Sequence, residues 1–198
     1  FLLMCPIGIA WFVATNFEKK RLAKFLATYV LISLATILSW STFFEHGFFE
    51  QLSEKRNAFI SLAIQENSNS LFSTQQMETG FPNVILEPIA GFIKSLTQPS
   101  LSSNPNAINT IAAIENLLVL AILLFLIVYS LKNSFREWSL LLALCLTLSM
   151  SFLAITGMVT PVAGALVRYK ANLIPFMIIP LLVASGLGAR INKILSRF

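Results

Sequence analysis

Two cations stand two residues apart at the end of an otherwise apolar segment, as Arg168 and Lys170. An arginine offers a planar fork of donors that fits a phosphate or carboxylate, and a lysine adds a compact positive charge. Tyr169 between them offers a ring that can stack on a sugar or anchor at a membrane interface. This set predicts an anion-binding site. The alternative is that both cations extend to lipid headgroups while Tyr169 joins an interfacial aromatic belt.

A second polar pair, Glu115 and Asn116, lies just inside another apolar segment. An ionisable side chain inside a membrane span is a candidate functional residue, and Glu115 could pair with Arg168. Asn116 could help to hold a ligand or could bond to a neighbouring helix. Glu115 could also be a first-turn acid that the helix dipole favours. The candidate substrate-binding residues are therefore Arg168, Lys170, Tyr169, Glu115 and Asn116.

Other chemistries have no residues to carry them. All nine acidic residues are Glu, and His46 is the single histidine. A Ser-His-Asp triad and a histidine-based zinc site are therefore excluded, and His46 is interpreted as an interface residue. Cys5 and Cys145 lie inside apolar segments, where a free cysteine packs as a small hydrophobe. We predict no metal and no cofactor.

The composition is that of a membrane protein. Hydrophobic residues make up 56% of the chain and the mean hydropathy is +0.77, whereas soluble domains are about 45–50% apolar. We predict an all-α fold, a polytopic helical membrane protein forming one domain over residues 1–198. Five transmembrane helices are expected, at about 1–17, 22–44, 111–131, 139–160 and 171–187. The first residue is not Met, so we expect the sequence to be part of a longer chain.

Residues 45–109 are predicted to form a helical loop outside the cytoplasm. A stretch of that length without helices would be unusual, and 48–64 is one candidate helix. A second is predicted from a stripe of apolar residues that recurs with helical spacing, and we expect it to lie on the outer membrane surface before ending at Gln98-Pro99. The stripe consists of Ile85, Ile89, Phe92, Ile93 and Leu96.

The charge pattern predicts the orientation in the membrane. Nine cations fall in the segments around residues 19–24, 132–136 and 190–197. Short loops rich in Lys and Arg stay in the cytoplasm, so the residue 1 end is expected outside and the C-terminus inside. Arg168 and Lys170 are then the only cations in a short outer loop. The net charge of +5 reflects this bias, and we expect no binding to nucleic acid.

The segment from Val159 to Lys170, followed by Leu173-Ile174-Pro175-Phe176, resembles the closing segment of a group of bacterial multi-spanning proteins. That segment has the form G-x-x-x-R-Y-x-x-x-x-x-P-F. The group assembles envelope polysaccharides and includes O-antigen polymerase-like proteins and membrane glycosyltransferases of the GT-C type. The segment from Ala113 to Leu117 also resembles members of this group.

The resemblance implies a protein of the bacterial inner membrane that binds a lipid-linked saccharide or another anionic lipid at its outer face. In the family an outer arginine handles the phosphates of a polyprenyl-linked sugar, a role that carries over to Arg168 with Lys170 as a helper. GT-C enzymes use an acidic residue, usually Asp, in their first outer loop, and this chain has no Asp. Whether the chain is an enzyme therefore stays open, with a catalytic residue expected upstream if it is one.

Two other functions stay open. The chain could be a non-catalytic subunit of a larger envelope complex, such as a secretion or motility machine, in which the loop and the span faces contact membrane protein partners. It could also be a transporter, for which the interruptions at Pro175 and Pro180 are the only indication.

Overall fold

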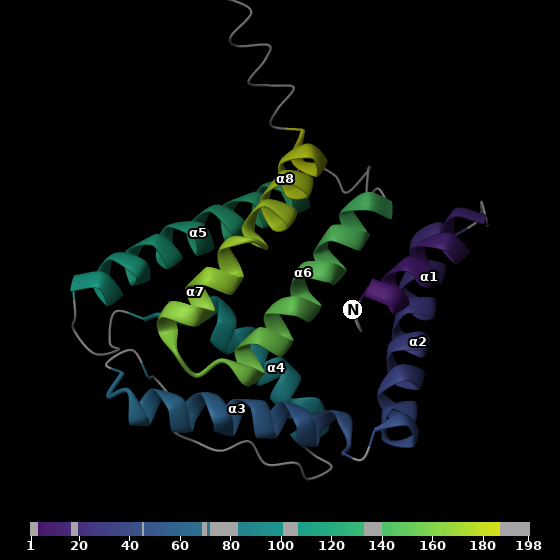
Figure 1. The fold of residues 1–198 in the computed structure, drawn as a ribbon. Helices are drawn as coiled ribbons and strands as arrows, with labels where there is room; N and C mark the ends of the chain where they lie inside the picture. The colour runs from purple at the N-terminus through teal and green to yellow at the C-terminus, as the bar shows by residue number, and fades with distance from the viewer. Residues whose placement is uncertain are drawn as a thin grey trace, which may run out of the picture.

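The computed structural model describes residues 4–16, 20–44, 46–68, 71, 83–100, 107–132 and 140–186. These residues form eight helices and no strand, which confirms the all-α prediction (Figure 1). The basic turn predicted around 132–138 lies almost wholly outside the described residues, as do Lys19 and the basic tail at 190–197. The helices are α1 (Met4–Asn16), α2 (Arg21–Phe43), α3 (Phe48–Gln65), α4 (Asn83–Thr97), α5 (Ala107–Lys132), α6 (Leu140–Val159), α7 (Ala163–Ala171) and α8 (Ile174–Ser185).

Three of these helices, α2, α5 and α6, are long and apolar enough to cross a membrane. Their bounds agree closely with three of the predicted spans. A fourth span is formed if α7 and α8 are taken together, although the pair bends by 43°. Helix α1 has 13 residues, which at 1.5 Å per residue reach about 20 Å, less than the hydrocarbon core of about 30 Å. The described residues thus contain three or four candidate spans, and the predicted count of five is not confirmed.

The segment between the fourth and fifth predicted spans contains a helix. Helix α7 begins at Ala163, directly after Pro161 and the extended Val162, and its nine residues carry both Arg168 and Lys170. The chain bends at Asn172 and Leu173, before α8 begins. Pro175 stands in the first turn of α8 and has no N–H to donate to the carbonyl of Ala171, so the α-helical ladder is interrupted there.

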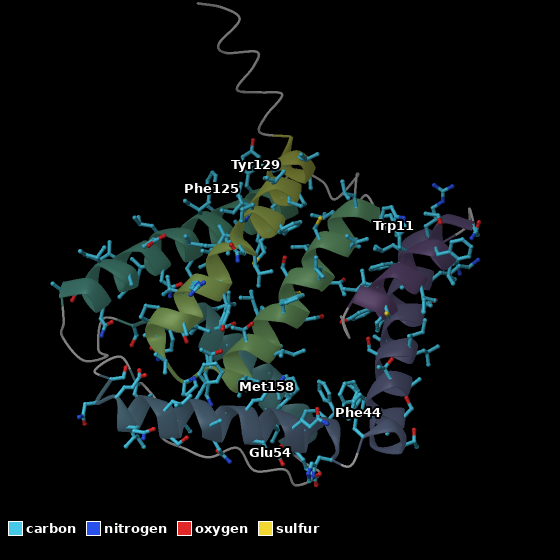
Figure 2. All side chains as sticks on the ribbon, in the orientation of Figure 1. Trp11, Phe44, Glu54, Phe125, Tyr129 and Met158 are labelled. Carbon is cyan, nitrogen blue, oxygen red and sulfur yellow. The ribbon has the colours of Figure 1, made fainter. Side chains whose placement is uncertain are left out.

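Helix α3 lies across one end of the molecule, below the end of α6 and beside the end of α2 (Figure 1). Its buried residues recur three and four positions apart and so form one face, consisting of Leu52, Arg56, Ile60 and Ala63. The opposite face carries exposed charges, of which Glu54 is visible in Figure 2. This helix confirms the candidate predicted at 48–64 and shows that the ends of α2 and α6 lie at the same end of the bundle.

Helix α4 makes its most extensive packing contact with α6. The two backbones touch at a pair of glycines, because a Cβ on Gly157 would overlap the carbonyl group of Gly91. A Cβ on Gly91 would in turn lie 2.5 Å from the carbonyl oxygen of Ala154. Small residues allow helices to approach this closely within membranes. The crossing brings α4 into the bundle.

The apolar stripe of α4 is consequently divided between two environments. Phe92 and Leu96 pack against a cluster formed by residues of α5, α6 and α8, whereas Ile89 and Ile93 are each 53% exposed. The second half of α4 therefore packs against α5, α6 and α8, while its placement on the outer membrane surface stays a prediction. The reason is the close contact of Gly91 with Gly157 on α6. The hydropathy of the sequence does not predict this contact.

Large apolar side chains cover the outside of the spans. On α5, Phe125 is 58% exposed and stacks on Tyr129 with ring centroids 5.8 Å apart, and both project from the same end of the helix (Figure 2). On α2, Leu31 and Leu38 are largely exposed. Such surfaces are stable in contact with hydrocarbon and costly in water. They are compatible with a membrane protein.

Candidate functional site

Lys170 is the centre of a buried polar cluster between α4, α5 and α7. Its side chain is 6% exposed, and its Nζ donates to the carbonyl oxygens of Ser95 at 2.9 Å and Gln98 at 2.8 Å. A third bond runs to Asn116 Oδ1 at 2.5 Å. A lysine ammonium has three N–H donors, so all of them are engaged within the protein. An added phosphate would have to displace one of these acceptors.

The carbonyls that Lys170 binds belong to the C-terminal end of α4, where helical carbonyls lack their usual partners. Ser95 would normally accept from the residue four positions later, but that residue is Pro99, which has no N–H. Leu96 would accept from Ser100, whose N–H instead donates to the Gln98 side chain at 3.1 Å. Because these carbonyls lie inside the bundle, donors must come from other helices.

Asn116 is the second residue that donates a hydrogen bond to the C-terminal end of α4. Its Nδ2 donates to the carbonyl of Leu96 at 2.9 Å while its Oδ1 accepts from Lys170, and its side chain is 7% exposed. Lys170 and Asn116 together therefore cap α4 from two neighbouring helices. A positive charge is also favoured at this place, because a helix C-terminus carries partial negative charge.

Arg168, Tyr169 and Glu115 lie on the outside. All three are exposed, and the Arg168 guanidinium makes no hydrogen bond or ion pair with a described residue. The Glu115 carboxylate acts on the Lys170 ammonium through space without replacing any of its three acceptors. The structure thus brings Lys170 and Asn116 together, with Glu115 near them, and directs Arg168 elsewhere.

Arg56 is a functional candidate that the sequence did not single out. It is 3% exposed on α3, and its Nη1 donates to the carbonyl of Met158 at 3.1 Å, in the last turn of α6. Burial lowers the pKa of Arg56, and the negative charge of Glu87 on α4 opposes that shift. The sequence contained a signal for the burial of Arg56, because this residue lies four positions from both Leu52 and Ile60 and so shares one face of the helix with these apolar residues. Arg56 and Lys170 are thus both buried cations at helix C-termini.

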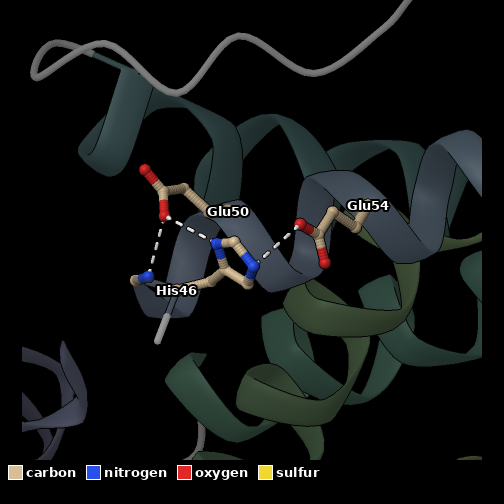
Figure 3. A network of polar contacts seen from close by, with 4 residues as sticks. His46, Glu50 and Glu54 are labelled. Carbon is tan, nitrogen blue, oxygen red and sulfur yellow. Dashed lines mark hydrogen bonds and ion pairs between the residues drawn. The ribbon is translucent and has the colours of Figure 1, made fainter. Parts of the chain in front are cut away.

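His46 lies in a separate, exposed cluster at the start of α3 (Figure 3). Its two ring nitrogens lie 3.9 Å from carboxylate oxygens of Glu50 and Glu54, and the Gly47 N–H donates to Glu50 at 2.9 Å. Ion pairs in water contribute little, and within the described part of the chain no three His, Cys or Glu side chains gather as metal ligands. This cluster caps α3 and carries no chemistry that we can assign.

No protein-family model, curated protein or solved structure matches the chain.

Proposed function

We propose that this chain is a bacterial inner-membrane protein that binds a lipid-linked saccharide, or another lipid with an anionic headgroup, at its outer face during envelope polysaccharide assembly. Arg168 is the phosphate ligand. The observation that carries the proposal is the contrast between two neighbouring cations: Lys170 is buried and fully bonded, whereas Arg168 is exposed and makes no hydrogen bond or ion pair with a described residue.

Helical geometry separates the two cations. Successive residues of an α-helix are turned by about 100°, so Arg168 and Lys170 face nearly opposite sides of α7. Lys170 holds the inner side of α7 against α4 and α5, and Arg168 is thereby presented on the outer side. The proposed site therefore uses Arg168 and not both cations together. A ligand can reach Arg168 without disturbing the hydrogen bonds of Lys170.

The surroundings of Arg168 fit an amphiphilic ligand. Arg168 stands in the last turn of α7, one turn before the bend that leads into the strongly apolar helix α8. Tyr169 is 45% exposed and offers a ring with a polar tip beside the guanidinium. A guanidinium binds a phosphate through two parallel hydrogen bonds, and such charge-assisted bonds are stronger where water is scarce.

The test compares binding of polyprenyl phosphate with binding of the neutral polyprenol, using the purified chain in lipid nanodiscs and native mass spectrometry. Arg168→Ala should weaken the phosphate lipid by about 10-fold to 100-fold, which corresponds to the loss of one charge-assisted contact. The neutral polyprenol should be unaffected. Lys55→Ala is the matched control, because Lys55 is an exposed cation on α3.

Two results would contradict the proposal. One is an Arg168→Ala variant that binds polyprenyl phosphate as tightly as the unaltered chain, and the other is equal weakening by Lys55→Ala, which would indicate unspecific attraction of anions. Either result would favour the alternative of a non-catalytic subunit in a larger envelope complex.

A further inference from the structure

A groove of about 350 Å³ lies between α6 and α8. Its volume falls within the range of about 300–1,000 Å³ that is usual for ligand sites. The wall on α6 belongs to the first two turns of that helix, between Leu141 and Cys145. The wall on α8 consists of Pro175, Phe176, Ile179, Pro180, Val183 and Ala184. We call this feature the α6–α8 groove.

The α6–α8 groove is open on the outside of the bundle. Three of its residues on α8, Phe176, Ile179 and Val183, are 48%, 59% and 73% exposed. From Pro175 to Ala184 its wall extends about 14 Å at 1.5 Å per residue, which is about half of the 30 Å hydrocarbon core. A lipid chain can therefore enter the groove sideways and lie in it over the depth of one leaflet.

Arg168 and the groove lie on one continuous outer face of α7 and α8. Asn172 and Leu173 at the bend both keep helical backbone angles, so the helical phase continues from α7 into α8. At about 100° per residue, Pro175 and Ile179 lie within about 20° of Arg168 around this path. The buried residues of the two helices form a separate inner stripe, which consists of Leu166, Lys170, Leu173, Met177 and Leu181.

We infer that the α6–α8 groove holds the polyprenyl chain of the lipid whose phosphate Arg168 binds, and this inference rests on the proposed function. The phosphate lies at the end of α7, and the chain runs from Pro175 along α8 into the leaflet on that side. One face thus offers a cation to the phosphate and, seven residues further along, an apolar groove to the chain.

The groove suits a chain that is attached directly to its phosphate. A glycerolipid carries ester carbonyls between its phosphate and its chains, and these need hydrogen-bond donors when they are buried. The Cys145 thiol, a weak donor, is the only donor among the side chains that line the groove. Pro180 deprives the carbonyl of Phe176 of its helical N–H, which adds an acceptor and not a donor. A polyprenyl chain has no ester and avoids this cost.

The groove should contribute less to binding than Arg168 does. A chain that moves from the bilayer into the groove exchanges one hydrocarbon environment for another, so the gain comes from van der Waals packing alone. We therefore expect the loss of the groove to weaken binding about threefold to tenfold.

The first experiment measures retention of polyprenyl phosphate by the purified chain, using native mass spectrometry from lipid nanodiscs. Ile179→Trp fills part of the groove and should weaken retention about threefold to tenfold. Leu118→Trp is the matched control, because Leu118 is 57% exposed on α5 and does not line the groove. Retention of phosphatidic acid should be the same in both variants. Circular dichroism and gel filtration identify any variant that is not folded.

The second experiment locates the chain directly. Polyprenyl phosphate with a diazirine on the isoprene unit nearest to the phosphate is irradiated in the nanodiscs, and the labelled peptide is identified by mass spectrometry. The label should lie on α8 between Pro175 and Val183. In Arg168→Ala the yield of this label should fall in proportion to binding.

Equal retention of polyprenyl phosphate by folded Ile179→Trp and Leu118→Trp would overturn the groove, and so would a label confined to helices other than α6 and α8. Equal weakening of phosphatidic acid by Ile179→Trp would overturn the isoprenoid occupant. An Arg168→Ala variant that binds as tightly and is still labelled on α8 would contradict Arg168 as the phosphate ligand while supporting the groove. The failure of this inference is thereby distinguished from the failure of the proposed function.

Discussion

Replacing Lys170 with Met tests whether the end of α4 depends on a buried cation. Met retains much of the length and volume of the lysine side chain but has no N–H donors. The substitution therefore leaves Ser95 O, Gln98 O and Asn116 Oδ1 without the donor they share. Asn116 keeps its own bond to the carbonyl of Leu96.

The expected loss of stability is about 3 kcal/mol. A buried acceptor left without a donor costs about 1–3 kcal/mol, which for three acceptors gives at least about 3 kcal/mol. Interhelical hydrogen bonds inside membranes average about 0.6 kcal/mol, which gives about 2 kcal/mol for three. Removing a buried ammonium returns part of its desolvation cost, and this keeps the loss near the lower end of the first range.

The assay is equilibrium unfolding of the purified chain in mixed micelles with increasing SDS, followed by far-ultraviolet circular dichroism. Arg168→Met is the matched control, since it removes an exposed cation from the same helix and should change stability by less than about 0.5 kcal/mol. Asn116→Leu should also destabilise, and combined with Lys170→Met it should cost less than the sum of the two because both act on one cap.

The reasoning would be refuted by a Lys170→Met variant that unfolds at the same SDS fraction as Arg168→Met. It would also be refuted by full additivity of Lys170→Met and Asn116→Leu, because two residues that cap the same helix end should not act independently.

Three further substitutions test the packing and the second buried cation. Gly157→Ala should destabilise by about 1–3 kcal/mol in the same SDS titration by separating α4 from α6, whereas Gly164→Ala, where a Cβ has open space, should be neutral within error. Arg56→Met should lower stability by about 1–3 kcal/mol because the last turn of α6 loses a donor, and a comparable loss in Lys55→Met would contradict this. Tyr29→Phe should cost about 0.5–1.5 kcal/mol, since its hydroxyl lies 2.5 Å from Ser151 Oγ, and thermal scans of detergent-solubilised protein would show no change if that bond were unimportant.

The all-α class and the main apolar helices could be predicted from composition and hydropathy alone. Spans α2, α5 and α6 appear where apolar runs of membrane length occur, and α3 appears where its apolar residues recur with helical spacing. These features depend on residues near one another in the sequence, because backbone hydrogen bonds must be satisfied within each helix in a membrane.

The candidate site was found only in part. The sequence marked Lys170 and Asn116 as polar residues in unusual places, and both do lie in one buried cluster. Their acceptors could not be predicted, because Ser95 and Gln98 belong to a helix 70 or more residues away from Lys170 in the chain. A prediction from residue type alone also placed Lys170 and Arg168 in one anion site, although they face opposite sides of α7.

The sequence by itself therefore determined that the chain forms apolar helices and that a few cations lie at their ends, since local spacing and hydropathy decide both. Only the tertiary structure decided which cation is buried and which remains exposed. The physical reason is the contact between Gly91 and Gly157: it admits α4 between the spans, and the carbonyls at its inner end then require the donors of Lys170 and Asn116.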